Sequence, residues 1–300
     1  MQNIAKLIRI EPGFDDPGFV REMFERHAPY RTMAGYLPIK AQASSLPWFR
    51  GNWAANGEPL VAGAGKILHN RRFIDAARSF FGGSTVRPTF VVVNVNAPMP
   101  AGLTHVDVPA FRGATRDQYP LAFLVCMGQS GLFENWRVIQ AGAWFYDGPG
   151  GNFEYWPDGL EHPMRTECPP FRNVALMSDN DQIYHRIGQV GAPDAQLPRM
   201  TSAAEIRWIG GSWEIVEYGE TRATYPLKTV RLSLVWKAVR ELEPQSELLN
   251  LDRIMTIFTS DLRRRSIDFK IPADPLSDSQ WLAMLDRLYY VRTDSENPKE

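Results

Sequence analysis

Cysteine is scarce in this sequence of 300 residues, where only Cys126 and Cys168 occur. Two cysteines form no disulfide framework, and neither belongs to a Cys-x-x-Cys pair. No Gly-x-Ser-x-Gly segment is present, and neither cysteine has a histidine partner that the sequence identifies, so nucleophilic catalysis has no support. We therefore expect reduced thiols and a functional site built from other residue types.

An excess of charge is also missing, because 33 Lys and Arg residues stand against 34 Asp and Glu residues. Without a basic surplus or a polybasic block, we expect neither nucleic acid nor a membrane as a partner. No apolar run approaches the roughly 20 residues that span a bilayer. Residues 1–6 contain no signal-peptide apolar core, so we expect a cytoplasmic protein.

Phosphate-binding loops are absent as well. No Gly-x-Gly-x-x-Gly follows a strand, and no Walker loop is found. The glycine-rich stretch Gly148–Gly151 is not followed by a helix whose N-terminus would hold phosphate. We interpret it as the loop of a hairpin.

Short β-type runs are plentiful, and they alternate with loops of Gly, Pro, Asp and Asn. We interpret residues 136–156 and 173–190 as two hairpins. Residues 28–65 are expected to be irregular, and residues 191–210 to be loop with a possible short helix. The predicted strands are 4–10, 89–95, 120–126, 136–146, 153–156, 173–177, 183–190, 212–218 and 230–238. The predicted helices are 19–24, 71–81, 248–262 and 278–290.

Many short strands joined by turn residues predict a mainly β fold, a double-sheet jelly roll with helical N- and C-terminal extensions. We expect a core domain over residues 1–240, with an insertion at about 191–228. Residues 241–300 are expected to form a C-terminal helical extension packed on that core.

The candidate site begins with His105-Val106-Asp107, which follows the predicted strand 89–95 through a Pro- and Gly-rich corner. Residues two apart on a strand point to the same face, so this imidazole and this carboxylate lie beside one another. His185, in a later strand, is the natural third ligand. Two His and one carboxylate leave three positions open, as in non-haem Fe(II) oxygenases. The alternative interpretation is a hydrogen-bonded His near a capping Asp.

Residues 91–107 together with residues 173–190 resemble the Fe(II)/2-oxoglutarate-dependent oxygenase superfamily, whose motif is His-x-Asp/Glu followed by a distal His on a late strand. The resemblance covers about residues 86–240. It implies a double-stranded β-helix, a form of jelly roll. It also implies Fe(II) held by His105, Asp107 and His185 as catalytic metal ligands, with 2-oxoglutarate and O2 as co-substrates and hydroxylation as the default reaction.

In that family an Arg on the next core strand pairs with the distal carboxylate of 2-oxoglutarate, often with a Ser or Thr two positions on. Arg231 and Ser233 match this pattern, and a guanidinium suits a carboxylate bidentately. The gap from His185 is longer than usual, so residues 191–228 would have to be looped out. Arg199 fits the gap better but lies in a loop-like stretch. Asn94, an amide in an apolar strand, is a further candidate for binding the co-substrate.

Trp144, Tyr146 and Arg112 are candidates for substrate binding, although such aromatics are more often core and such Arg residues structural. Long loops that can close over a cavity favour a small-molecule substrate. The oligomeric state is open. Two alternatives remain: a non-haem metal oxidase or cupin-like enzyme without 2-oxoglutarate, and a jelly-roll ligand-binding protein without catalysis.

Overall fold

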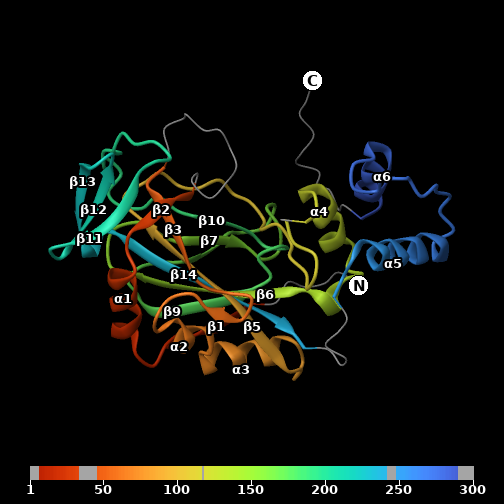
Figure 1. The fold of residues 1–300 in the computed structure, drawn as a ribbon, viewed down its shortest axis with the longest axis horizontal. Helices are drawn as coiled ribbons and strands as arrows, with labels where there is room; N and C mark the ends of the chain where they lie inside the picture. The colour runs from red at the N-terminus through yellow and green to blue at the C-terminus, as the bar shows by residue number, and fades with distance from the viewer. Residues whose placement is uncertain (1–6, 34–45, 117, 242–247, 290–300) are drawn as a thin grey trace. The chain divides into compact units, whose positions relative to one another are not determined.

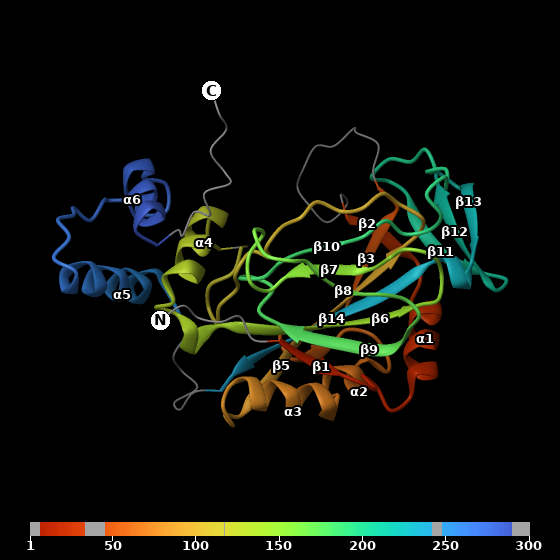
Figure 2. The same cartoon turned by 180° about the vertical axis from the view of Figure 1, so that it is seen from behind.

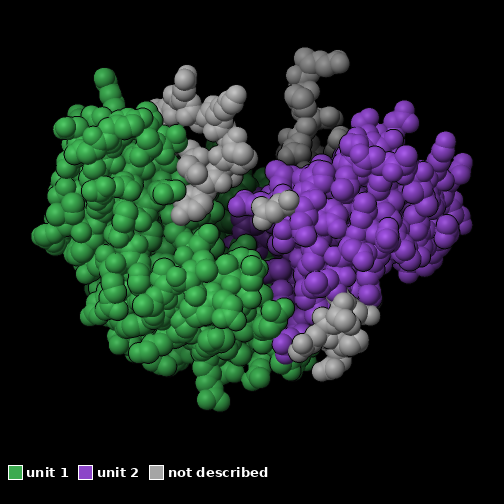
Figure 3. Space-filling view, viewed as in Figure 1, with its two compact units in different colours: residues 1–105, 139–179, 183–238 green, residues 106–138, 180–182, 239–300 purple. Residues whose placement is uncertain are grey.

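The computed structural model describes most of the chain, and it divides into two compact units (Figure 3). Unit 1 comprises residues 1–105, 139–179 and 183–238; unit 2 comprises residues 106–138, 180–182 and 239–300. Within these ranges, the described residues are 7–33, 46–116, 118–241 and 248–289.

Unit 1 is built on a large, mainly antiparallel sheet of 11 strands, ordered β1-β9-β6-β14-β5-β3-β2-β11-β12-β13, with β4 paired to β3 (Figure 1). The strands are β1 (Leu7–Ile10), β2 (Tyr30–Thr32), β3 (Trp48–Ala55), β4 (Glu58–Pro59), β5 (Val86–Asn96), β6 (Val138–Tyr146), β9 (Phe171–Ser178), β11 (Glu205–Ile209), β12 (Ser212–Glu217), β13 (Glu220–Pro226) and β14 (Arg231–Arg240).

A second sheet has the order β10-β7-β8 (Figure 2), from β7 (Phe153–Trp156), β8 (Arg165–Glu167) and β10 (Tyr184–Ile187). Residues 99–105 extend it through the bridges Met99↔Val190 and His105↔His185. The strands β5, β6, β9 and β14 belong to the large sheet. Between them in the sequence lie segments of the small sheet: residues 99–105 between β5 and β6, β7 and β8 between β6 and β9, and β10 between β9 and β14. This alternation between two sheets is that of a jelly roll, so the predicted fold class is confirmed.

The two faces of the large sheet differ because side chains alternate along each strand. Val91, Val93 and Val95 of β5 belong to the largest apolar cluster, as do Leu232, Leu234 and Trp236 of β14. The helices α1 (Pro17–Arg26), α2 (Ala64–Leu68) and α3 (Arg71–Phe80) contribute buried apolar side chains to this cluster. By alternation, the opposite face carries the candidate residues Asn94, Trp144, Tyr146, Arg231 and Ser233.

Local sequence signals set the ends of two of these helices. Asp16 caps α1 by accepting the Phe19 N–H at 2.9 Å, with Pro17 at the first helical position. Asn70 caps α3 by accepting the Arg72 N–H at 2.9 Å. The predicted helices 19–24 and 71–81 are confirmed.

Unit 2 has its own apolar core, formed by α4 (Leu121–Ser130), α5 (Leu251–Arg264) and α6 (Ser279–Tyr289) with residues such as Phe123, Phe133 and Phe258. The prediction of a strand at 120–126 was wrong, because a short apolar run suits a buried helix as well as a strand. Pro120 precedes the first turn of α4, and Gly131 follows its end with φ +66°. Among the described residues, every helix is too short or too polar to cross a membrane.

The two predicted hairpins are not formed. β6 pairs with β9, while β7 pairs with β10 and β8. Likewise β9 pairs with β1 and β6, so the strands either side of the turn at 179–181 lie in different sheets. The alternating pattern of a strand specifies its faces but not its partner, and a jelly roll sends consecutive strands to opposite sheets.

Two segments predicted as irregular or looped out are partly β-structure. Residues 28–65 contain β2 and β3, and the insertion at 191–228 contains the meander β11-β12-β13, which extends the large sheet. The remaining predicted strands and helices are found within a few residues of their expected bounds. The parts of these predictions at residues 4–6 and at residue 290 lie outside the described residues.

The predicted division of the chain at residue 240 stays a prediction. Residues 106–138 and 180–182, which were expected in the jelly-roll domain, belong to unit 2 together with residues 239–300.

The two thiols are expected to react at very different rates. Cys126 is buried in the unit 2 core, and burial raises its pKa to about 12, whereas Cys168 is exposed. Because the thiolate is the reactive form, one thiol per chain should react quickly with Ellman's reagent at pH 8, and the second only after denaturation. Loss of the fast phase in Cys168→Ser would assign it, and rapid reaction of both native thiols would contradict the burial of Cys126.

Candidate metal centre

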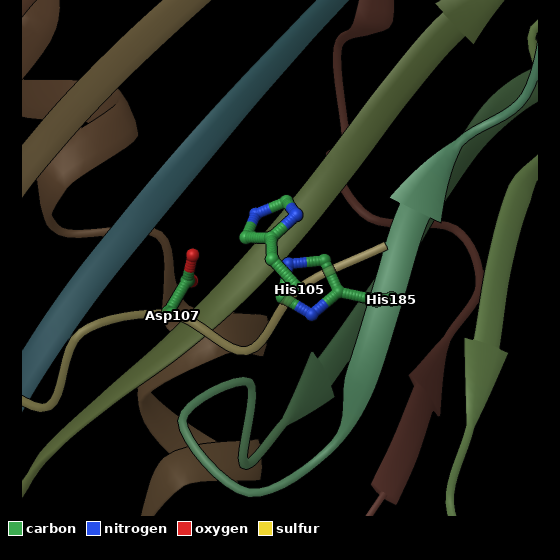
Figure 4. Close-up of side chains that lie close together, drawn as sticks. All are labelled: His105, Asp107 and His185. Carbon is green, nitrogen blue, oxygen red and sulfur yellow. The ribbon is translucent and has the colours of Figure 1, made fainter. Parts of the chain in front are cut away.

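His105 and His185 are brought together by an antiparallel bridge. The His105 N–H donates to the His185 carbonyl at 3.1 Å, and the His185 N–H donates to the His105 carbonyl at 2.9 Å. Directly opposed residues on paired strands point to the same face. The ring centroids are accordingly 4.6 Å apart, and Figure 4 shows the two imidazoles close together.

Asp107 completes the group two positions after His105. Its N–H donates to the Asn180 carbonyl at 2.8 Å. His105, Asp107 and His185 each offer one ligand atom, and these three atoms lie within 4.8 Å of one another. The structure therefore brings together all three candidate metal ligands that the sequence suggested.

Both histidines are oriented through their Nδ1 atoms. His105 Nδ1 lies 2.8 Å from the Leu103 carbonyl oxygen, and His185 Nδ1 lies 2.9 Å from the Ile183 carbonyl oxygen. A carbonyl oxygen only accepts, so Nδ1 donates in each case and the neutral ring carries its lone pair on Nε2. Metal-binding histidines use the same arrangement, which fixes the ring and its tautomer. Two imidazoles and a carboxylate are a donor set that fits Fe(II).

Arg231, at the start of β14, is completely buried. Its Nε donates to the Gly151 carbonyl at 2.8 Å, but neither Nη1 nor Nη2 has a hydrogen-bond partner among the described residues. Burial lowers the pKa of this guanidinium to about 9. A buried charged group with two unused donors is unfavourable by itself and fits an anionic ligand, for which a guanidinium offers two parallel donors.

The loop beside Arg231 is held by Tyr146. The Tyr146 hydroxyl donates to the Pro149 carbonyl at 2.8 Å and accepts the Gly191 N–H at 3.2 Å, and burial raises its pKa. A Cβ at Gly151, where φ is +71°, would lie 2.7 Å from the Tyr146 ring and 3.2 Å from the Arg231 side chain. Only glycine lets the backbone come so close to both side chains.

The other candidate residues occupy varied positions. Ser233 is buried and lies two residues after Arg231, on the same face of the strand. Trp144 is also buried, and its ring stacks on that of Phe153 with the ring centroids 5.0 Å apart. Arg112 is buried in unit 2, where its backbone bonds to Trp136 and Leu249. Arg199 is exposed in a stretch without regular structure. The substrate-binding roles of Trp144, Tyr146 and Arg112 stay predictions.

Asn94 is held by a strand that the sequence did not reveal. Its Oδ1 accepts from Trp48 Nε1 at 2.9 Å and from Arg50 Nε at 3.1 Å, both on β3. Sequence reasoning missed Trp48 and Arg50 because residues 28–65 show no clear strand period. The register of β3 against β5, which pairs Arg50 with Asn94, follows from tertiary structure alone.

Neither a protein-family model nor a curated protein sequence matches this chain. Solved structures resemble it at low identity. A 2OG-Fe(II) oxygenase family oxidoreductase from Burkholderia pseudomallei has a TM-score of 0.41 and 11% identity, over 78% of this chain and 84% of that one. A Pseudomonas putida prolyl-4-hydroxylase has a TM-score of 0.43 and 10% identity, over 79% and 94%. HygX from Streptomyces hygroscopicus, solved with nickel, 2-oxoglutarate and hygromycin B, has a TM-score of 0.40 and 8% identity, over 80% and 84%.

Proposed function

We propose that this protein is an Fe(II)- and 2-oxoglutarate-dependent oxygenase that hydroxylates a small molecule. The observation that carries the proposal is the group of His105, Asp107 and His185, with ligand atoms within 4.8 Å of one another. Two imidazoles and one carboxylate would hold Fe(II) and leave room for a chelating co-substrate and O2.

Bound together, Fe(II) and 2-oxoglutarate supply the oxidising chemistry that places one oxygen atom of O2 in a C–H bond as 2-oxoglutarate becomes succinate and CO2. The protein's own residues bind and orient. His105 and His185 would bind the metal through Nε2 while backbone carbonyls hold their Nδ1 protons. Asp107 would add a negative charge that offsets the charge of the ion.

Arg231 would hold the distal carboxylate of 2-oxoglutarate through Nη1 and Nη2, with Ser233 as an additional donor on the same face of β14. Arg231 lies over the ring of Phe171, with its Cζ 5.8 Å from the ring centroid, and the Phe171 centroid lies 5.5 Å from that of Trp144. Excluding water in this way strengthens the attraction between the guanidinium and a carboxylate.

The same contacts weigh against the two alternatives. A metal oxidase without 2-oxoglutarate gives no reason for a fully buried guanidinium with two unused donors. A binding protein without catalysis gives no reason for two histidines and a carboxylate whose ligand atoms lie within 4.8 Å of one another.

An anaerobic titration with Fe(II) and 2-oxoglutarate tests the proposal. We expect a weak visible charge-transfer band when both are present, and slow formation of succinate once O2 is admitted. Unfolding free energy should rise by about 2.7 kcal/mol at a metal concentration 100-fold above the dissociation constant. Oxygen consumption without succinate would favour the metal oxidase, and the absence of metal-dependent stabilisation would contradict the enzyme proposal.

A further inference from the structure

A buried ion pair lies next to the peptide that holds Asp107. Arg137 is only 5% exposed, and its guanidinium engages the Asp181 carboxylate in the two-point geometry of a fork. The Nε–Oδ2 distance is 3.0 Å, and Nη2 donates to Oδ1. Nη1 also donates to Glu134 at 3.2 Å. Such a pair fixes both side chains more firmly than one exposed contact does.

Asp181 directly follows Asn180, whose carbonyl accepts the Asp107 N–H at 2.8 Å. The guanidinium of Arg137 and the backbone of Asp107 are therefore linked through one peptide segment of two residues. The turn that carries Asp181 is closed by the Ile183 N–H donating to the Asp179 carbonyl at 2.8 Å.

Arg137 is also tied to the chain just after Asp107. Phe111 and Arg137 form an antiparallel bridge, and the Val138 N–H donates to the Ala110 carbonyl at 3.0 Å. The segment from Asp107 to Phe111 is thus restrained at both ends, at one end through Asn180 and at the other by the backbone around Arg137.

From these contacts we infer that Arg137 and Asp181 are positioning residues for the carboxylate ligand. Their ion pair holds the Asn180 carbonyl in place, and that carbonyl fixes the backbone of Asp107. The inference rests on the proposed metal function, since it gives the pair a role only if Asp107 binds a metal.

The direction in which two substitutions change metal affinity distinguishes a positioning role from a purely electrostatic one. Arg137→Gln removes a positive charge, and Asp181→Asn removes a negative charge. If the pair acted only through its charges, the first change would strengthen the binding of a divalent cation and the second would weaken it. If the pair positions Asp107, both changes weaken binding.

We expect each of Arg137→Gln and Asp181→Asn to weaken Co(II) binding about 10- to 100-fold, the usual cost of removing a group that orients a metal ligand. The double variant should lose no more than either single variant, because both residues act as one unit. Affinity would be measured by the visible absorption of Co(II), at a temperature where circular dichroism shows each variant folded.

Asp261→Asn is the matched control. Asp261 is also buried in unit 2, where it pairs with Arg265 at 2.8 Å and accepts from Tyr289 at 2.8 Å, without a hydrogen bond to the Asp107 segment. Its loss should lower thermal stability and leave Co(II) affinity unchanged.

Unchanged Co(II) affinity in Asp181→Asn, or tighter binding in Arg137→Gln, would overturn the inference while leaving the proposed function intact. If these variants do not fold, Arg137→Lys decides, because it keeps the charge and loses the fork. Unchanged affinity there also overturns the inference. Failure of the unaltered protein to bind Co(II) would overturn the proposed function and the inference with it.

Discussion

Replacing Asp107 by alanine is expected to weaken Fe(II) binding by more than about 100-fold and to abolish succinate formation. Losing a group that only orients a ligand costs about 10- to 100-fold, and Asp107 is the one carboxylate in the three-residue group. Its side chain is partly exposed, so the fold should tolerate the change. Anaerobic Fe(II) titration and succinate assay at saturating 2-oxoglutarate would measure both effects.

Asp158→Ala provides the matched control, because Asp158 is an exposed carboxylate whose 3.3 Å contact is with Arg165. That variant should bind Fe(II) and form succinate like the unaltered protein. Normal succinate formation by Asp107→Ala would remove the residue from the metal site and with it the central argument for the proposed function.

Replacing Arg231 by methionine is expected to have opposite effects on binding and on stability. Truncating one side of a buried charged hydrogen-bonded pair costs about 2–5 kcal/mol, so the affinity for 2-oxoglutarate should fall about 30-fold or more. The ligand-free protein should become more stable by about 1 kcal/mol, because a buried guanidinium with two unused donors is replaced by an apolar side chain of similar length.

Two measurements separate these effects: a 2-oxoglutarate titration with Fe(II) held constant, and denaturant unfolding without ligand. Arg222→Met serves as a control, since Arg222 is exposed and pairs with Glu217 at 3.2 Å on the meander. A ligand-free Arg231→Met protein that is much less stable than the parent would mean that Arg231 serves the fold, and unchanged co-substrate affinity would remove it from the site.

The candidate metal ligands were predictable because each lies in a short local pattern. His105 and Asp107 sit two apart, where strand geometry alone places them together. His185 lies in a recognisable strand run. Arg231 and Ser233 were proposed from the family resemblance, because they match its Arg-x-Ser pattern on a predicted strand.

Other features depend on partners distant in sequence and were not predictable. Arg137 and Asp181 are 44 positions apart, and no local sequence pattern near either residue predicts their ion pair. Trp48 and Arg50 meet Asn94 only through the register of β3 on β5. The predicted strand pairings were wrong for the same reason. The residue pattern of β6 or β9 indicates which face of the strand is buried, but it does not indicate to which sheet the strand belongs. The predicted strand at residues 120–126 was wrong for a different reason. The apolar run there is too short to distinguish the period of a helix from that of a strand.

The reciprocal backbone hydrogen bonds between His105 and His185 affect how the candidate site would lose and rebind a metal. They form when the chain folds, so the two imidazoles are held opposite one another whether or not an ion is present. The conformational entropy of ordering them is lost at folding and not again at binding. If the site holds a metal as proposed, removing that metal with a chelator should leave the two histidines in place, so that the site can bind metal again without refolding.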